Sequence, residues 1–159
     1  MSVSHEYITS YKSKMDILNF IKTPEFFFKV TEAIGDNDYN FTPDITLKKN
    51  LALRKYVKWP QSVSYKGTPQ LPVSIPSVSV SETFINSTFN LVYDELYCDF
   101  NFKINNMLVD IHFKLSFEQE GEFQKVIIDC TNPDDIFLPN FLIKSIISNS
   151  DDVFEKIFG

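Results

Sequence analysis

The sequence contains few of the residues on which phosphate-binding loops, metal centres and disulfide frameworks depend. Its 159 residues include 4 Gly, 2 His and 2 Cys. With so little glycine, neither the Gly-rich dinucleotide fingerprint nor the P-loop pattern occurs. No HxH, HExxH or CxxC spacing marks a metal centre, and the GxSxG pattern of serine hydrolases is absent. We therefore expect a protein that is not an enzyme and that holds neither a metal nor a cofactor.

Long hydrophobic runs and an excess of positive charge are also missing. No apolar run reaches 18 residues, so no membrane span is expected. Residues 1–14 lack the apolar core of a signal peptide, which predicts a cytoplasmic location. The formal net charge of −6 argues against a nucleic-acid partner. The basic residues that do cluster are typical of a solvated sheet face, and they are Lys48, Lys49, Arg54, Lys55 and Lys58.

Phenylalanine is what the chain has in excess. It holds 16 Phe, and 43% of its residues are hydrophobic, a composition typical of globular rather than disordered proteins. A length of 159 residues suits one domain with a substantial core, so we assign residues 1–159 to a single domain. Because disulfides are rare in the cytoplasm, Cys98 and Cys130 are expected to be buried thiols.

The clearest structural pattern runs from Tyr97 to Cys130. Large apolar residues alternate there with charged and polar ones, which predicts antiparallel strands with one apolar face. Asn105 and Asn106 interrupt the pattern and suit a tight hairpin turn. The turn predicts cross-strand pairs that are apolar on both sides, namely Ile104 with Met107, Phe102 with Val109 and Phe100 with Ile111.

A further strand is expected from Phe123 to Cys130, after a polar link around Gly121. The sequence does not tell which of its residues face inward, because Val126, Ile127 and Ile128 are consecutive and all apolar. The acidic residues of the link, 118–122, are typical of a solvated turn.

The N-terminal third predicts a strand followed by a helix. Residues 1–6 are expected to form a frayed tail, and the first strand is expected between Tyr7 and Ile21. A Thr-Pro-Glu sequence at 23–25 is typical of a helix start. Apolar residues at helical spacing then predict a helix over Pro24–Ile34, with Gly35 as its C-cap.

The middle of the chain predicts more strands. Apolar residues at alternate positions from Ile45 to Trp59 favour a strand, and residues 48–50 are a candidate turn within it. Residues 60–81 contain four prolines, which predicts loops and short edge strands. The apolar patches between Glu82 and Leu96 predict one more strand.

The last segment, Pro139–Phe158, predicts an amphipathic helix that covers the apolar face of the sheet. Its apolar positions are Ile143, Ile146, Ile147, Phe154, Ile157 and Phe158. The predicted fold class is therefore α+β, with a curved antiparallel sheet wrapped around a long C-terminal α-helix and a short helix after the first strand. The alternatives are another α+β domain of a sheet and helices, or a β-sandwich with peripheral helices.

Two segments carry a resemblance to a known superfamily. The first runs from Phe20 through Pro24 to Asp36, where a strand is expected to lead into a Pro-acidic-x-aromatic helix. The second is the finish, with the strand Val126–Cys130 and the Leu138-Pro139 pair before the last helix. The chain resembles the START-like (helix-grip, SRPBCC) superfamily, which includes the pollen-allergen Bet v 1 type. It departs from the pollen type in lacking a Gly-rich loop and in the proline content of 60–81.

The resemblance implies a single START-like domain that binds a lipid or other hydrophobic small molecule, without catalysis, between sheet and helix. The lining residues that we select are Phe100, Phe102, Ile111, Phe113 and Ile147. A Cys-His nucleophile is not favoured, because His112 is expected on the outer face of the sheet. The alternative function is a structural or protein-interaction protein, such as a viral one, with a filled core and a protein partner. Its binding surface would be a sheet edge or the segment 60–81, including Val78 and Val80.

Overall fold

The fold is derived from a computed structural model of the chain. It describes the backbone of residues 2–36, 41–43, 55–67, 83–104, 107–131, 147 and 150–159. Side chains are described for residues 3–33, 55–66, 84–101, 110–130, 147 and 150–159.

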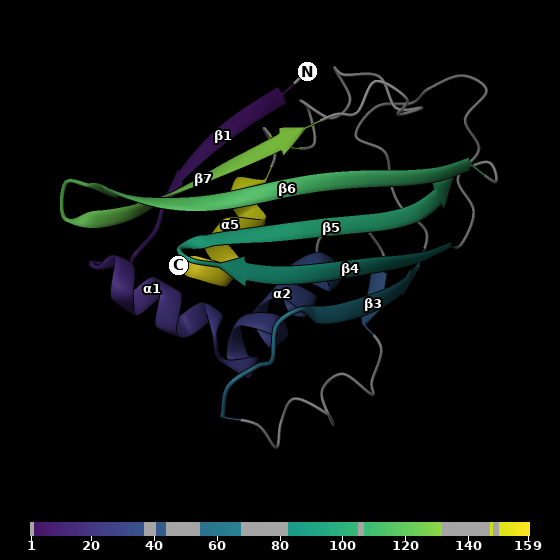
Figure 1. The fold of residues 1–159 in the computed structure, drawn as a ribbon, viewed down its shortest axis with the longest axis horizontal. Helices are drawn as coiled ribbons and strands as arrows, with labels where there is room; N and C mark the ends of the chain where they lie inside the picture. The colour runs from purple at the N-terminus through teal and green to yellow at the C-terminus, as the bar shows by residue number, and fades with distance from the viewer. Residues whose placement is uncertain are drawn as a thin grey trace.

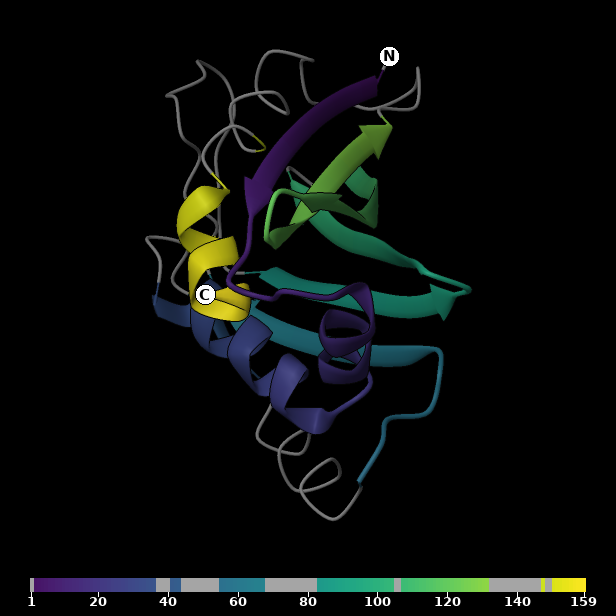
Figure 2. The ribbon, with the colours of Figure 1, turned by 90° about the vertical axis from the view of Figure 1, so that its left-hand side faces the viewer.

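An antiparallel sheet forms the body of the protein. The described part of the chain supplies seven strands in the order β1-β7-β6-β5-β4-β3-β2, with the first strand beside the last. Figure 1 shows the sheet face on, and Figure 2 shows how strongly it curves. The strands are β1 (Ser2–Ile8), β2 (Phe41–Pro43), β3 (Gln61–Gly67), β4 (Thr83–Val92), β5 (Glu95–Ile104), β6 (Met107–Glu120) and β7 (Phe123–Thr131).

The predicted register of β5 and β6 is confirmed. Phe100 lies opposite Ile111, and the pairing continues through Phe102 and Val109 to Ile104 and Met107. The two asparagines of the predicted turn, 105–106, lie outside the described residues. Because side chains alternate between faces, the match places one apolar set on the inner face of both strands.

The open question about β7 is resolved by burial. Val126 and Ile128 are buried on the inner face, whereas Ile127 lies on the outer face and is half-buried. β7 is sandwiched between β6 and β1, so both of its edges are paired.

The expectation for the N-terminus was wrong in part. Residues 2–8 form β1, which pairs with β7 along its whole length, so residues 2–6 are not a frayed tail. The second half of Tyr7–Ile21 is the helix α1 (Lys14–Ile21). Ser13 caps α1, because its side chain accepts a hydrogen bond from the Asp16 backbone N–H. Ser-x-x-Asp was the sequence signal for this start.

The helix predicted from Pro24 is confirmed and runs slightly further than expected. α2 (Pro24–Asp36) continues through Gly35, which is therefore not its C-cap. Thr23 closes the preceding turn, since its hydroxyl donates to the carbonyl oxygen of Phe20 at 2.7 Å. Two helices, α1 and α2, thus stand between β1 and β2.

The strand predicted from Ile45 to Trp59 is not formed in its described part. Residues 55–60 are irregular, and residues 44–54 lie outside the described residues. The prediction of loops and short edge strands over 60–81 misses β3, which pairs with both β2 and β4. The strand expected between Glu82 and Leu96 is confirmed as β4, and β5 follows it after a tight turn.

The C-terminal helix lies in the hollow of the sheet. Its described part is α5 (Asp151–Phe158), which buries Phe154, Ile157 and Phe158 as the apolar pattern predicts. The rest of the predicted Pro139–Phe158 range lies outside the described residues, apart from Ile147 and Ser150. α2 packs against α5, and Figures 1 and 2 show both helices on the same, concave side of the sheet. The predicted α+β architecture is confirmed.

No helix in the part of the chain that the structure describes is both long and apolar enough to cross a membrane.

The packed core centres on Phe26. Its side chain is 2% exposed, and its ring contacts the rings of Phe27, Phe89 and Phe158 at centroid distances of 5.1, 6.3 and 6.1 Å. Most of these contacts are edge-to-face, a geometry that stabilises aromatic pairs beyond the area they bury. Phe26 therefore joins α2 to both the sheet and α5.

Phe26→Ala is expected to lower the free energy of unfolding by about 3–5 kcal/mol, because it leaves a cavity where three elements meet. Urea denaturation followed by circular dichroism measures the change. Phe84→Ala is the matched control, since Phe84 is 60% exposed on β4 and should change stability by less than about 1 kcal/mol. Equal losses in the two variants would contradict the assigned core.

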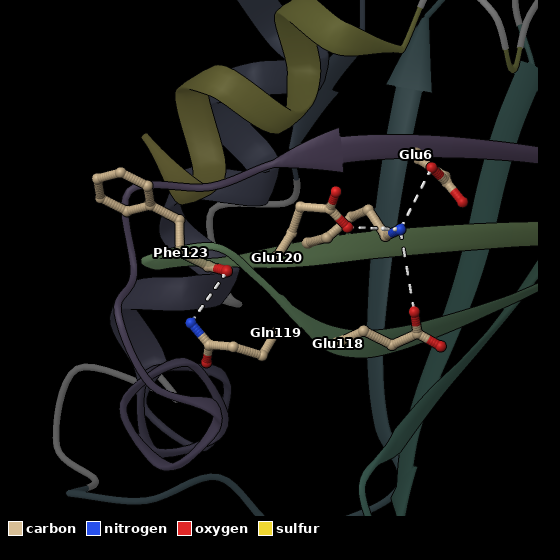
Figure 3. Close-up of polar contacts among 6 residues, drawn as sticks. Glu6, Glu118, Gln119, Glu120 and Phe123 are labelled. Carbon is tan, nitrogen blue, oxygen red and sulfur yellow. Dashed lines mark hydrogen bonds and ion pairs between the residues drawn. The ribbon is translucent and has the colours of Figure 1, made fainter.

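Lys125 joins three strands on the outer face. Its ammonium group lies 3.1 Å from Glu120, 3.4 Å from Glu6 and 3.9 Å from Glu118. Figure 3 shows the three carboxylates converging on this nitrogen from β1 and β6. The hydrogen bond with Glu120 is the main cause that raises the pKa of Lys125. The stabilisation is therefore present throughout neutral pH and is lost only as the pH rises through that raised pKa.

Lys125→Met should lower the urea midpoint, because three neighbouring carboxylates then repel one another without a cation between them. Lys114→Met is the control, since Lys114 meets one carboxylate, Glu95, at 3.4 Å. We expect added salt to recover part of the loss in the Lys125 variant by screening the repulsion. A Lys114 variant that is equally destabilised would argue against the three-strand role.

Candidate functional site

A row of aromatic rings crosses the concave face from the C-terminal helix to the middle of the sheet. It runs from Phe158 through Phe26 and Phe89 to Phe100 and Phe113, with successive centroid distances of 6.1, 6.3, 6.1 and 5.4 Å. The first three rings are at most 3% exposed. Phe100 and Phe113 are only half-buried, although both face inward. The row therefore changes along its length from closed core to accessible apolar surface.

Three of the five predicted lining residues lie together at the accessible end. Phe100 and Phe113 meet edge to face with an interplanar angle of 78°, and Ile111 lies opposite Phe100 in the register. Ile111 is 6% exposed. The backbone of Phe102 pairs with Val109 beside this group, and its side chain lies outside the described ones.

Ile147 lies elsewhere along the chain, just before α5. It is 2% exposed, so it belongs to the core, and its carbonyl oxygen accepts the Ser150 backbone N–H at 3.2 Å. The structure gives no ring contact or strand pairing that joins it to Phe100 and Phe113.

The other phenylalanines of the chain could also have lined a cavity. Several of the described ones are buried in the packed core instead, namely Phe26, Phe27, Phe117, Phe154 and Phe158. Phe28 is half-buried against the core, whereas Phe137 and Phe141 lie outside the described residues. The half of the concave face under α2 and α5 is therefore filled by side chains.

Polar groups interrupt this apolar surface on β3, β4 and β5. Tyr65 is 1% exposed and Ser87 is 1% exposed, and both face inward on paired strands. Cys98 lies next to them on β5 and is 3% exposed. Burial raises the pKa of Tyr65, and the neighbouring Ser87 hydroxyl opposes that rise. All three groups are therefore neutral at physiological pH.

Solved structures with a similar fold identify this arrangement. The crystal structure of Ara h 8.0201, a Bet v 1 allergen, matches with a TM-score of 0.50 and 13% sequence identity, covering 100% of this chain and 95% of that one. The chain has a Bet v 1-like, helix-grip fold. Within the described residues, β1 lies beside β7, and α2 and α5 lie on the concave side of the sheet (Figure 2).

Two further solved structures align over almost the whole chain. Protein CV1439 from Chromobacterium violaceum is 10% identical, with a TM-score of 0.44 over 99% of this chain and 95% of that one. DynU16, a protein from the dynemicin biosynthetic locus, is 9% identical, with a TM-score of 0.45 over 98% of this chain and 45% of that one. No protein-family model matches the sequence, and a search of curated proteins finds no match either.

The two cysteines of this helix-grip sheet lie at the same level on the two strands that flank β6, and they are too far apart to touch. Cys98 and Cys130 both lie opposite Phe113, one on each side of β6. Two interstrand spacings separate them, about 10 Å, whereas the Cα atoms of a disulfide are at most about 7 Å apart. Both are free and buried, as predicted. Burial raises the pKa of Cys98, and it raises the pKa of Cys130 to about 11.

The two histidines lie on opposite faces of the sheet. His112 is on the outer face, as predicted, where its Nδ1 lies 2.6 Å from Asp99. His5 is on the inner side of β1, and its Nε2 lies 2.6 Å from an oxygen of Asp151 at the start of α5. The sheet therefore separates His112 from both thiols. Among the described residues, no group of three His, Cys, Asp or Glu is arranged to hold a metal ion.

Sequence reasoning missed Tyr65 and Ser87 as residues of this surface. Tyr65 falls within the proline-containing segment 60–81, whose prolines obscured the alternation of Val63 and Tyr65 with serines. That alternation, Gln-Ser-Val-Ser-Tyr-Lys, is a strand signal with a period of two. Ser87 gave no sequence signal of its own, because a serine on a strand belongs equally well to either face.

Neither thiol is expected to react with iodoacetamide in the folded protein near neutral pH. The thiolate is the reactive form, and burial favours the thiol at both positions. Intact mass should show no adduct under native conditions and two adducts in guanidinium chloride. Intact mass measured after mild oxidation should show no intramolecular disulfide. A disulfide between Cys98 and Cys130 would contradict their separation across β6.

Proposed function

We propose that this protein binds a lipid or other hydrophobic small molecule in a cavity between the curved sheet and the C-terminal helix. The observation that carries the proposal is the half-buried, inward-facing pair Phe100 and Phe113 at the end of an otherwise closed aromatic row. An apolar surface that faces inward and stays accessible is the usual wall of a site for apolar ligands. The proposed lining residues are Phe100, Phe102, Ile111, Phe113 and Ile147.

The fold supports the same proposal. Proteins with a Bet v 1-like or polyketide cyclase-like fold often bind hydrophobic ligands between sheet and helix. This chain has the curved sheet that such a site needs, and its C-terminal helix covers only part of the concave face in the described residues.

We further propose binding without catalysis. The two thiols that flank Phe113, those of Cys98 and Cys130, are buried and their pKa values are raised, so both are poor nucleophiles. The imidazole of His112 lies on the other face of the sheet and pairs with Asp99, out of reach of the concave surface. A turnover assay with esters of hydrophobic acids should therefore show no protein-dependent hydrolysis.

A cytoplasmic location remains a prediction. Its support is the pair of free, buried thiols, which is typical of reducing compartments. Fractionation of the host cells would test it, and recovery of the protein outside the cytoplasmic fraction would contradict it.

Phe113→Trp tests the site directly. We expect the affinity for the neutral dye N-phenyl-1-naphthylamine to fall about tenfold, because the larger ring occupies the accessible end of the row. The free energy of unfolding should change by less than about 1 kcal/mol, whereas overpacking of a filled core costs about 1–3 kcal/mol. Fluorescence titration measures the first quantity and urea denaturation the second.

Tyr97→Trp is the matched control, because Tyr97 lies on the outer face of the neighbouring strand β5 and is 41% exposed. It should leave both quantities unchanged. A Phe113 variant that loses stability and dye affinity in proportion would argue for a filled core instead.

The second candidate is a structural or protein-interaction protein with a filled core. The aromatic cluster around Phe26 favours it, because the ring of Phe26 contacts those of Phe89 and Phe158, and all three residues are at most 3% exposed. Val78 and Val80, the residues that the sequence suggested for contact with a protein partner, lie outside the described residues.

Native mass spectrometry of protein from its own host, followed by organic extraction, separates the two functions. A co-purifying apolar molecule near unit stoichiometry is the outcome that the binding function predicts. Repeated apo masses, or a multimer without a ligand, would favour the interaction protein.

A further inference from the structure

The hydroxyl of Tyr65 is a buried polar group that the fold leaves unsatisfied. Tyr65 is 1% exposed, and among the described residues its hydroxyl oxygen has no hydrogen-bond partner. The neighbouring Ser87 hydroxyl lowers the pKa of Tyr65, but it donates its own proton to the Val63 carbonyl oxygen at 2.9 Å and lies outside hydrogen-bond geometry with Tyr65. A buried hydroxyl without a partner destabilises a fold, and a hydrogen bond to a bound molecule would recover that free energy.

The position of this hydroxyl links it to the accessible end of the aromatic row. The pKa of Tyr65 is raised first by burial, and Ser87 and Cys98 are the neighbours that modify it. In the register, Ser87 lies opposite Phe100, and Cys98 lies opposite Phe113. The hydroxyl is therefore directed toward the part of the concave face where those two phenyl rings lie.

We propose that Tyr65 is the polar anchor of the ligand site and that the ligand is an apolar molecule carrying a neutral carbonyl or hydroxyl oxygen. This inference rests on the proposed binding function and adds a requirement for one oxygen. The Tyr65 hydroxyl donates its proton to that oxygen, while the rings of Phe100 and Phe113 contact the hydrocarbon part.

The charge of the surroundings favours a neutral oxygen over a carboxylate. Among the described strand residues that face the concave side, His5 is the one basic residue. Its Nε2 already lies 2.6 Å from the carboxylate of Asp151. A carboxylate beside Tyr65 would lose its hydration without gaining a cation, and burial of an unpaired charge is strongly unfavourable. A ketone, ester or alcohol oxygen loses far less hydration and needs only one donor.

Two probes of the same shape test the anchor. 2-Acetylnaphthalene carries a carbonyl oxygen, and 2-isopropenylnaphthalene replaces that oxygen with a CH₂ group. Displacement of the neutral dye N-phenyl-1-naphthylamine gives the affinity of each. Tyr65→Phe should weaken the ketone roughly three- to tenfold, the range for loss of one neutral hydrogen bond. The hydrocarbon should change by less than about twofold, because it makes no hydrogen bond.

Tyr7→Phe is the matched control. Tyr7 also faces the concave side, but it lies on β1, where its ring contacts Phe154 at 5.8 Å. Removing its hydroxyl should leave both affinities unchanged. The infrared carbonyl band of 2-acetylnaphthalene bound to the unmodified protein gives an independent readout. It should lie at lower wavenumber than in hexane and should return toward the hexane value in the Tyr65 variant.

The outcomes separate the anchor from the site. An unchanged ketone affinity, together with an unshifted carbonyl band, would overturn the anchor and leave apolar binding intact. An equal loss of both probes in Tyr65→Phe would also overturn the anchor, since it would indicate a change in the shape of the site. If neither probe binds the unmodified protein, the binding function fails along with the anchor.

Discussion

The contact between the rings of Phe26 and Phe158 is the interaction on which the rest of the fold depends. It joins α2 to α5 at a centroid distance of 6.1 Å, and Phe26 also reaches Phe89 on the sheet. A curved sheet with one apolar face is stable only if that face is covered, and these rings hold both helices over it. Burial of each such ring contributes about 1.5–3 kcal/mol, so the cluster is a large part of the stability of the fold.

The same packing divides the concave face into a closed part and an accessible part. Rings near the helices are closed in on all sides, while Phe100 and Phe113, further along the same row, remain half-buried. The buried hydroxyls of Tyr65 and Ser87 lie beside this accessible end. A filled half stabilises the protein, and the other half combines apolar rings with a polar group that lacks a partner. This division of the concave face is the basis of the proposed binding function.

Much of the sheet could be predicted because its signals are local. The alternation in β5 and β6 determined which face is apolar, and the two asparagines between them determined the register. The Thr-Pro-Glu sequence likewise predicted the start of α2, and the spacing of apolar residues predicted the buried face of α5. β1 was missed because its pattern is weak, with His5 at an inward position where an apolar residue is expected. It becomes a strand through pairing with β7, a contact between the two ends of the chain.

The sequence by itself determined the strand period, the β5–β6 register and the apolar faces of α2 and α5, because each depends on residues close together in the chain. Only the tertiary structure decided that Cys98 and Cys130 flank Phe113 without meeting, and that Lys125 lies among carboxylates from two other strands. It also decided that the Tyr65 hydroxyl is buried without a partner. These properties depend on which distant segments become neighbours, and sheet topology rather than local pattern controls that.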